Sequence, residues 1–180
     1  MSTTKIICFA NNKGGSGKST TCSNVGCGLA ELGHKVLMVD GDMQMNLSLA
    51  YFDEERVLEF ASGGKNLYEA VKNQKDLKDY IIHTPFENLD LIPSSTLMSS
   101  IEYELFTKWQ REFILKKCLQ NIKESEVYDY ILIDCPPSLN MLTVNAMTTA
   151  NTVLVPIQCE YYALEGLSQL IHTVNLVKER

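Results

Sequence analysis

A glycine-rich segment near the N-terminus has the composition of a phosphate-binding loop. It reads Asn11-Asn12-Lys13-Gly14-Gly15-Ser16-Gly17-Lys18-Ser19-Thr20 and lies between an apolar run and a helical pattern. Glycines allow successive backbone N–H groups to turn inward around phosphates, and the N-terminus of the next helix adds partial positive charge. Lys18 is placed to reach the β- and γ-phosphates, and the Ser19 hydroxyl to coordinate Mg²⁺. A strict motif has glycine where Asn12 stands, so an ordinary glycine-rich turn is the alternative.

Three aspartates follow apolar runs and are candidates for metal binding or catalysis. Asp134 ends the run of residues 130–133, where a carboxylate can hold a Mg²⁺-bound water. Asp40 and Asp42 end the run of residues 36–39, where one acid could orient an attacking water and the other could support the Mg²⁺ shell. The alternative for all three is that they cap turns.

Lys13 is a second cation in the loop, and an ordinary phosphate loop does not need it. It is either a solvated loop lysine or a group that acts on a nucleotide other than the one bound by Lys18.

Short apolar runs alternate with helical patterns along the chain, which predicts strand–helix–strand units. Predicted strands cover residues 5–10, 36–39, 89–93, 130–133 and 152–156, and predicted helices cover 19–32, 101–122, 138–149 and 164–177. Residues 41–90 are patterned less clearly. Continuously apolar strands favour an α/β fold, with a mostly parallel doubly wound sheet and helices on both faces. Ligands bind beyond the carboxyl ends of such strands, so residues 11–20, 40–46, 134–138 and 156–160 should form the site.

The composition limits the classes of protein to consider. The chain has 180 residues, 45% of them apolar, and a net charge of −6, which argues against a broadly basic nucleic-acid-binding surface. No apolar run approaches the length of a membrane span. Six cysteines occur without a Cys-x-x-Cys pair, which favours free thiols in a reducing cytoplasm.

Four motifs together resemble the ParA/Soj partition ATPases, which belong to the deviant Walker A group that includes MinD. They are residues 13–20, Val-Asp-Gly-Asp-Met-Gln-Met-Asn at 39–46, Tyr-Asp-Tyr-Ile-Leu-Ile-Asp-Cys-Pro-Pro-Ser at 128–138, and Pro-Ile-Gln-Cys-Glu-Tyr-Tyr-Ala-Leu-Glu-Gly at 156–166. They occur in the family order and span nearly the whole chain. The resemblance implies a P-loop NTPase fold, with ATP and Mg²⁺ as cofactors and residues 1–180 as one ATPase domain.

The resemblance also assigns roles to individual residues. It implies catalytic roles for Lys13 and Asp42; nucleotide binding by Lys13, Gly14, Gly15, Ser16, Gly17, Lys18, Ser19, Thr20 and Glu160; and Mg²⁺ binding by Ser19, Asp40 and Asp134. Glu160 matches a position that touches nucleotide across the dimer in relatives. Met43 and Met45 depart from the family pattern, in which proline and a small residue are usual, so the loop that moves on hydrolysis is expected to differ here.

The function implied by the resemblance is an ATP-dependent homodimer switch in plasmid or chromosome partitioning. Hydrolysis is expected to be slow and stimulated by a ParB-like centromere-binding protein, at a cytoplasmic, nucleoid-associated location without a membrane. Relatives continue beyond the end of this sequence, and we expect non-specific DNA binding only through that C-terminal part. With Lys18 serving its own loop, Lys13 should reach across a two-fold interface to the partner's nucleotide.

Other functions on the same scaffold remain open at this stage. One is a metabolic or redox enzyme, resembling dethiobiotin synthetase or the nitrogenase iron protein, although Cys135 has no suitably placed second cysteine for an iron–sulfur cluster. Another is a MinD-like positioning ATPase, although residues 164–180 do not form a basic amphipathic helix. A nucleotide-binding module without catalysis is the third.

Overall fold

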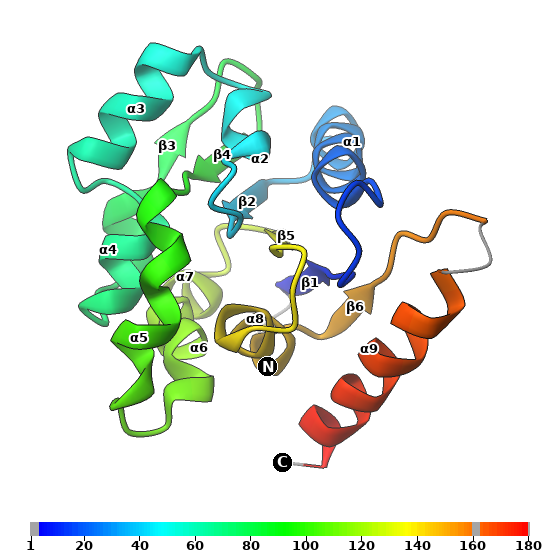
Figure 1. Ribbon diagram of the computed structural model, residues 1–180. Helices are drawn as coiled ribbons and strands as arrows, with labels where there is room; N and C mark the ends of the chain where they lie inside the picture. The colour runs from blue at the N-terminus through cyan, green and yellow to red at the C-terminus, as the bar shows by residue number, and fades with distance from the viewer. Residues whose placement is uncertain (1–3, 160–162, 180) are drawn as a thin grey trace.

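A six-stranded sheet forms the centre of the computed structural model, which describes residues 4–159 and 163–179 (Figure 1). The strands are β1 (Lys5–Phe9), β2 (Val36–Asp40), β3 (Ile82–His83), β4 (Leu89–Ile92), β5 (Tyr130–Asp134) and β6 (Thr152–Leu154). Their spatial order is β3-β4-β2-β5-β1-β6. All neighbouring pairs are parallel except β3 with β4. The predicted mostly parallel sheet is confirmed, with an antiparallel edge that was not predicted.

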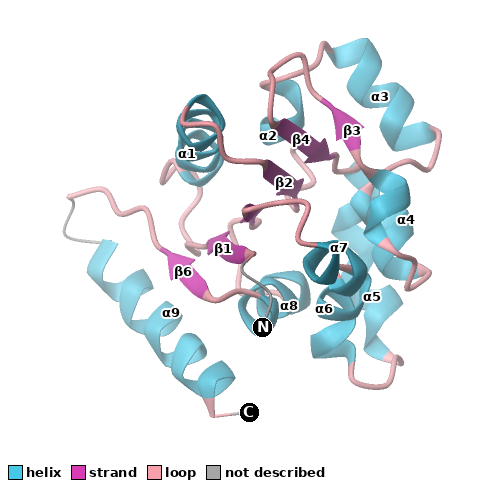
Figure 2. Cartoon of the chain, turned by 180° about the vertical axis from the view of Figure 1, so that it is seen from behind, coloured by secondary structure: helices cyan, strands magenta, loops and turns pink. Residues whose placement is uncertain are grey.

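Helices cover both faces of the sheet, with side chains of α4 to α8 in the apolar core on one face and side chains of α1 and α2 in the core on the other. The α-helices are α1 (Lys18–Glu31), α2 (Asn46–Leu49), α3 (Glu54–Ser62), α4 (Leu67–Lys72), α5 (Ile101–Phe106), α6 (Ile114–Cys118), α7 (Gln120–Ser125), α8 (Met141–Thr149) and α9 (Ala163–Lys178). Three short 3₁₀ helices are η1 (Leu77–Tyr80), η2 (Thr96–Ser100) and η3 (Arg111–Phe113). Seen from behind, α9 lies beside β6 at one edge of the sheet (Figure 2).

Alternate side chains of the strands enter two separate apolar cores, as the two-residue period of a strand requires. Ile6 and Cys8 of β1 belong to the larger core, which also contains side chains of α4 to α8. Phe9 belongs to the smaller core, where Cys22 of α1 and Leu47 of α2 pack against it. Both faces of the strands are therefore buried, which explains their continuously apolar sequences.

The first predicted helix is confirmed, and it is followed by a glycine as expected. Gly33 has a φ of 88°, a left-handed conformation that glycine adopts without strain. The carboxyl ends of β1, β2 and β5 lie side by side in the sheet, with Phe9 paired to Asp134 and Asp40 paired to Asp134. This arrangement brings the loops that follow these strands to one edge.

The single helix predicted over residues 101–122 is wrong. The segment is divided into α5, η3, α6 and α7, and Trp109, predicted to be in the core, is 85% exposed. The buried amide of Asn145 on α8 inserts into the backbone ladder: it accepts a hydrogen bond from the Leu115 N–H at 3.0 Å and donates one to the Arg111 carbonyl at 2.8 Å. In a continuous helix those two backbone groups would bond to each other, so the inserted side chain interrupts the helix between η3 and α6.

Helix α3 was missed, although its start carries a recognisable signal. Asp53 caps it by accepting a hydrogen bond from the Arg56 N–H at 2.8 Å, and two glutamates follow in the first turn. Among the described residues, no helix is long and apolar enough to cross a membrane.

Gly41 holds the β2–α2 loop against β5, and we expect Gly41→Ala to destabilise the fold. The Gly41 N–H donates to the Asp134 carbonyl at 2.9 Å, and a Cβ at this position would lie 2.7 Å from that carbonyl oxygen. The free energy of unfolding, measured with urea, should fall by about 1–3 kcal/mol. Gly28→Ala is the matched control, because a Cβ there meets nothing within 4 Å and α1 should gain helix propensity. Equal stability of Gly41→Ala and the wild type would refute this account of the loop.

Candidate nucleotide-binding site

The glycine-rich loop connects β1 to α1 and leaves the N-terminus of α1 open. Gly15 and Gly17 have φ values of 70° and 85°, and Gly17 is the N-cap residue without a side-chain cap. The first backbone N–H groups of a helix have no partner within the helix, and their partial positive charge attracts anions. The hydroxyl of Ser16 is buried and has no hydrogen-bond partner among the described residues. The loop thus offers several unused donors at one place.

Lys18 begins α1 with a side chain that is only 6% exposed. Its ammonium group donates to the carbonyl of Lys13 at 3.3 Å, so it is folded back over the loop. Burial lowers the pKa of Lys18, while the nearby charges of Asp134 and Asp42 act in the opposite direction. A buried ammonium beside two carboxylates is a local charge arrangement that an anionic ligand would complete.

Asp134 ends β5 and is fully buried next to this loop. The pKa of Asp134 is raised to about 7: burial and the charges of Asp40 and Asp42 raise it, while the Ser19 hydroxyl and the Lys18 charge act in the opposite direction. Neither carboxylate oxygen has a hydrogen bond of good geometry within the described residues. A buried carboxylate without partners is costly, because native structures nearly always pair such groups. The environment of Asp134 therefore fits a bound cation.

Asp40 has a different set of contacts, all within its own loop. Its carboxylate accepts hydrogen bonds from the Ser48 N–H at 2.8 Å, the Ser48 hydroxyl at 2.6 Å and the Asp42 N–H at 3.2 Å. Burial raises the pKa of Asp40 to about 6, against the effect of the Ser48 hydrogen bonds. These contacts hold the start of α2 against β2. A role for Asp40 in the Mg²⁺ shell stays a prediction.

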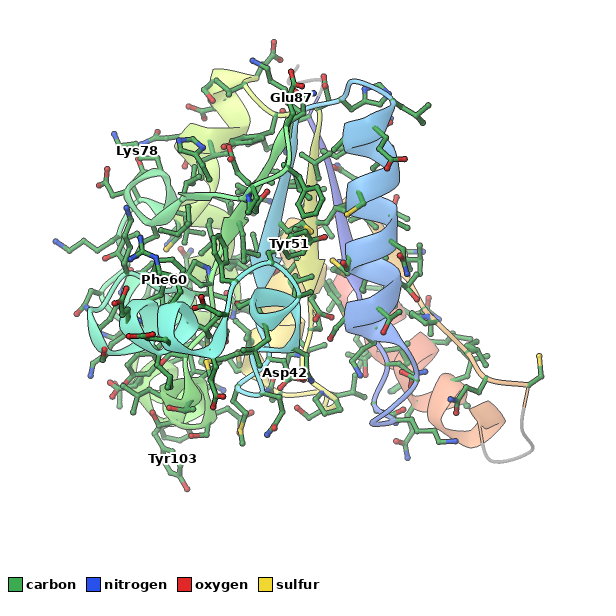
Figure 3. All side chains as sticks on the ribbon, turned by 90° about the horizontal axis from the view of Figure 1, so that it is seen from above. Asp42, Tyr51, Phe60, Lys78, Glu87 and Tyr103 are labelled. Carbon is green, nitrogen blue, oxygen red and sulfur yellow. The ribbon has the colours of Figure 1, made fainter. Side chains whose placement is uncertain are left out.

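Asp42 faces a cavity of about 660 Å³ in front of the loop. Figure 3 shows Asp42 at the edge of the molecule where the strands end. Its side chain is 6% exposed and accepts a hydrogen bond from the Gln44 N–H at 3.0 Å. The cavity is lined by Gly14, Gly15, Ser16, Gly17, Lys18, Ser19, Thr20, Ser23, Asn24, Asp42, Gln44, Asn46, Ala50 and Pro137. Predicted phosphate-binding residues and the predicted hydrolytic aspartate thus surround one space.

Three cavity residues, on α1 and directly after α2, were not predicted: Ser23, Asn24 and Ala50. Ser23 and Asn24 follow Thr20 by about one helical turn, and their polar side chains are the signal that could have identified them. Pro137 follows β5, within a segment expected at the site. A second cavity of about 490 Å³ lies between η3, α6 and α7, and no predicted site residue lines it.

Lys13 does not line the cavity in front of the phosphate loop and lies beside the segment that follows β6. Its ammonium group donates to the side-chain oxygen of Gln158 at 3.4 Å, and its N–H donates to the Asn11 side chain at 3.0 Å. Gln158 lies within residues 156–160, which were expected at the site, but no role was predicted for it individually. Glu160, predicted to touch nucleotide, lies outside the described residues.

The cysteines do not form a metal site in the described part of the chain. Cys8, Cys22, Cys118 and Cys135 are buried free thiols, and Cys159 is exposed. Burial raises the pKa of Cys22, and the neighbouring Cys8 thiol together with burial raises that of Cys135. No group of three or more His, Cys, Asp or Glu side chains within residues 4–159 and 163–179 is arranged to hold a metal. A metal at Asp134 would therefore need ligands from a bound molecule or water.

The raised pKa of Asp134 predicts a pH-dependent cost in stability. Between about pH 4 and 7 the folded chain keeps a proton that the unfolded chain has released, so this group stabilises the fold less as the pH rises. Asp134→Asn removes the effect. In chelator-containing buffer, the variant should gain on the order of 1–3 kcal/mol relative to the wild type between pH 5 and pH 8. Asp79→Asn, at an exposed aspartate, should show no such gain, and urea titrations at both pH values measure the difference. A pH-independent difference for Asp134→Asn would contradict the account.

The fold and this loop are those of the phosphate-loop nucleotide-binding proteins, with the ligand edge at the carboxyl ends of parallel strands. Residues 4–180 match the family described as AAA domain. The chain belongs to this family and is of the ParA/Soj type within it.

Comparisons with individual proteins agree with that assignment. The chain is 46% identical over 175 residues to the sporulation initiation inhibitor protein Soj of Bacillus subtilis. The matched region covers 97% of this chain and 66% of Soj. It is 42% identical over 176 residues to the chromosome partitioning protein ParA of Caulobacter vibrioides, with 97% of this chain and 63% of ParA covered. The chain therefore spans just under two thirds of the length of these relatives.

Solved structures share the fold over nearly the whole chain. The structure of cobyrinic acid a,c-diamide synthase from Mycobacterium smegmatis, with bound ADP and magnesium, has a TM-score of 0.86 at 32% identity. The superposed region covers 98% of this chain and 69% of the synthase chain. A plasmid partition protein from Borrelia burgdorferi, bound to AMPPNP, has a TM-score of 0.82 at 31% identity, with 97% and 69% covered.

Proposed function

We propose that this chain is the nucleotide-binding part of an ATP-dependent dimerisation switch that acts in chromosome or plasmid partitioning. The observation that carries the proposal is the buried, unpartnered carboxylate of Asp134 beside the Ser19 hydroxyl and the Lys18 ammonium. Two hard oxygen ligands and a buried cation at a helix N-terminus suit the magnesium complex of a nucleoside triphosphate.

Each part of the loop then has a distinct task toward the nucleotide. The backbone N–H groups of residues 14–20 and the Lys18 ammonium bind the phosphates, and Ser19 with Asp134 holds Mg²⁺ directly or through water. Mg²⁺ supplies charge neutralisation on the phosphates when it is bound. Asp40 supports this region through its hydrogen bonds to Ser48.

Hydrolysis depends on positioning and charge stabilisation rather than on covalent chemistry. Asp42 orients the attacking water from the wall of the cavity, with its carboxylate fixed by the Gln44 N–H. Lys13 offsets the charge that develops on the transferred phosphoryl group of the partner's nucleotide across a two-fold interface. A contact of Glu160 with nucleotide across that interface stays a prediction, because Glu160 lies outside the described residues.

The names of the curated relatives favour partitioning over the other functions of this scaffold. Soj and ParA are 46% and 42% identical to this chain, whereas cobyrinic acid a,c-diamide synthase is 32% identical. The partners we propose are a second copy of the chain, a ParB-like centromere-binding protein and nucleoid DNA.

Light scattering and phosphate release, measured on the same protein, test the proposal. MgATP should convert the chain from monomer to dimer and should be hydrolysed slowly, whereas MgADP should leave it monomeric. Lys75→Ala, at an exposed lysine far along the chain from the loop, should behave as the wild type. A folded chain that neither dimerises with MgATP nor releases phosphate would refute the proposed switch.

A further inference from the structure

The segment after β6 lies against the phosphate loop and is hydrogen-bonded to it at several points. The Ala10 N–H donates to the Leu154 carbonyl at 3.1 Å, and the Asn11 side chain donates to the Pro156 carbonyl at 2.7 Å. These contacts bring Gln158 against the loop residues, 143 positions away from Gly15 in sequence.

The side-chain amide of Gln158 bridges two loop residues. Its oxygen accepts from the Lys13 ammonium at 3.4 Å, and its nitrogen donates to the Gly15 carbonyl at 3.1 Å. An ammonium only donates and a carbonyl only accepts, so these two partners fix which way the amide faces. Only a side chain with both an acceptor and a donor at its end can make these two contacts, one with the Lys13 ammonium and one with the Gly15 carbonyl.

Gly15 is a loop residue whose backbone is restrained by a hydrogen bond from another segment of the chain. It has a φ of 70°, and a Cβ at this position would meet nothing within 4 Å, so the space on that side of the residue is open. Glycine also has the largest backbone freedom to lose when it is ordered. The hydrogen bond from Gln158 is therefore a restraint on an otherwise loosely held peptide.

That restraint sets the direction of a phosphate-binding donor. In a trans peptide the carbonyl of one residue and the N–H of the next point to opposite sides. With the Gly15 carbonyl turned toward Gln158, the Ser16 N–H points away from it. Gln158 does not line the cavity, whereas Gly15 and Ser16 do.

We propose that Gln158 is a positioning residue of the phosphate loop, which holds the Gly15–Ser16 peptide in the orientation that binds phosphate and keeps the Lys13 ammonium beside it. The inference rests on the proposed function and adds a second segment, the one after β6, to the nucleotide site. Gln158 acts through the loop and makes no contact with the reacting atoms.

Gln158→Met tests the role, because methionine lacks the amide that makes both hydrogen bonds. It has about the same length as glutamine and is also uncharged. The dissociation constant for MgATP, measured by calorimetry, should rise about three- to tenfold, the effect of losing one hydrogen bond. In the nucleotide-free chain, the ¹⁵N order parameter of the Ser16 amide should fall. The melting temperature should stay within about 1 °C of the wild type, since Gln158 is exposed. Cys159→Ala, at the next exposed position, is the control and should bind MgATP as the wild type does.

A double-mutant cycle assigns the effect to one of the two contacts. The loss of affinity caused by Gln158→Met should persist in a Lys13→Ala background, because the Gly15 contact carries it. Loss of the effect in that background would overturn the role through Gly15. MgATP binding by Gln158→Met within twofold of the wild type would overturn the inference alone, whereas a wild type that fails to bind MgATP would overturn the proposed function with it.

Discussion

Replacement of Asp42 by alanine should leave MgATP binding intact and reduce hydrolysis at least about 100-fold, as expected when a group that positions or deprotonates water is removed. Asp42 lies on the wall of the cavity, and the phosphate-binding donors come from a different loop, between β1 and α1. The variant should therefore accumulate in the ATP-bound, dimeric state. Single-turnover phosphate release and light scattering measure the two consequences separately.

Asp42→Asn separates the chemistry of the carboxylate from its structural contact. An asparagine oxygen can still accept the hydrogen bond from the Gln44 N–H that Asp42 accepts at 3.0 Å. Both variants should be equally inactive if the charge is what matters. Wild-type turnover by Asp42→Ala would return this residue to the role of a turn cap, and turnover restored by Asp42→Asn alone would show that only loop shape is needed.

Lys13→Ala should abolish both MgATP-dependent dimerisation and hydrolysis while leaving MgATP binding by the monomer. In the single chain, the Lys13 ammonium lies next to Gln158 and does not line the cavity, and it is Lys18 that is buried beside Asp134 and Asp42. We propose that Lys13 acts on a nucleotide bound by a second copy, where a cation that offsets developing charge would contribute as an arginine finger does. Calorimetry measures the binding, and light scattering the dimer.

Mixing two inactive variants tests the direction of the Lys13 contact. In a mixed dimer of Lys13→Ala and Lys18→Ala, the Lys13→Ala subunit keeps Lys18 and faces the intact Lys13 of its partner. Partial hydrolysis should return, because a two-fold interface makes the two sites equivalent in geometry. A mixture that stays inactive while mixed dimers form would exclude the role in trans. Normal hydrolysis by Lys13→Ala alone would make Lys13 a solvated loop residue.

The parallel strands and the phosphate loop were predictable because their signals are local. Five apolar runs matched strands, and the polar residues at their ends met at one edge because parallel strands share that edge. Ser19, Asp42 and Asp134 follow from this rule alone. The elements within residues 41–90 were predicted poorly. Among them, α2, η1 and β3 are only two to four residues long, which is too short for a periodic pattern of apolar residues.

The features that the sequence did not predict depend on contacts between distant segments. Asn145 interrupts the expected 101–122 helix between Arg111 and Leu115, and it lies 30 residues from Leu115 in the sequence, outside the segment that it affects. Asp40 accepts hydrogen bonds from the Ser48 N–H and hydroxyl, contacts that arise only when its own loop folds and that the sequence did not predict. Gln158 meets Gly15 only because β6 pairs with β1.

Titration calorimetry of the folded chain with MgATP tests the central claim, that the loop at residues 13–20 binds a nucleoside triphosphate, most directly. We predict saturable binding of one ATP per chain, weakened about 10- to 150-fold in Lys18→Ala, where a charge-assisted hydrogen bond worth about 1.5–3 kcal/mol is lost. Lys75→Ala, at an exposed lysine, should bind as the wild type does. Absence of heat from MgATP in protein shown to be folded, or equal affinity in Lys18→Ala, would contradict the account.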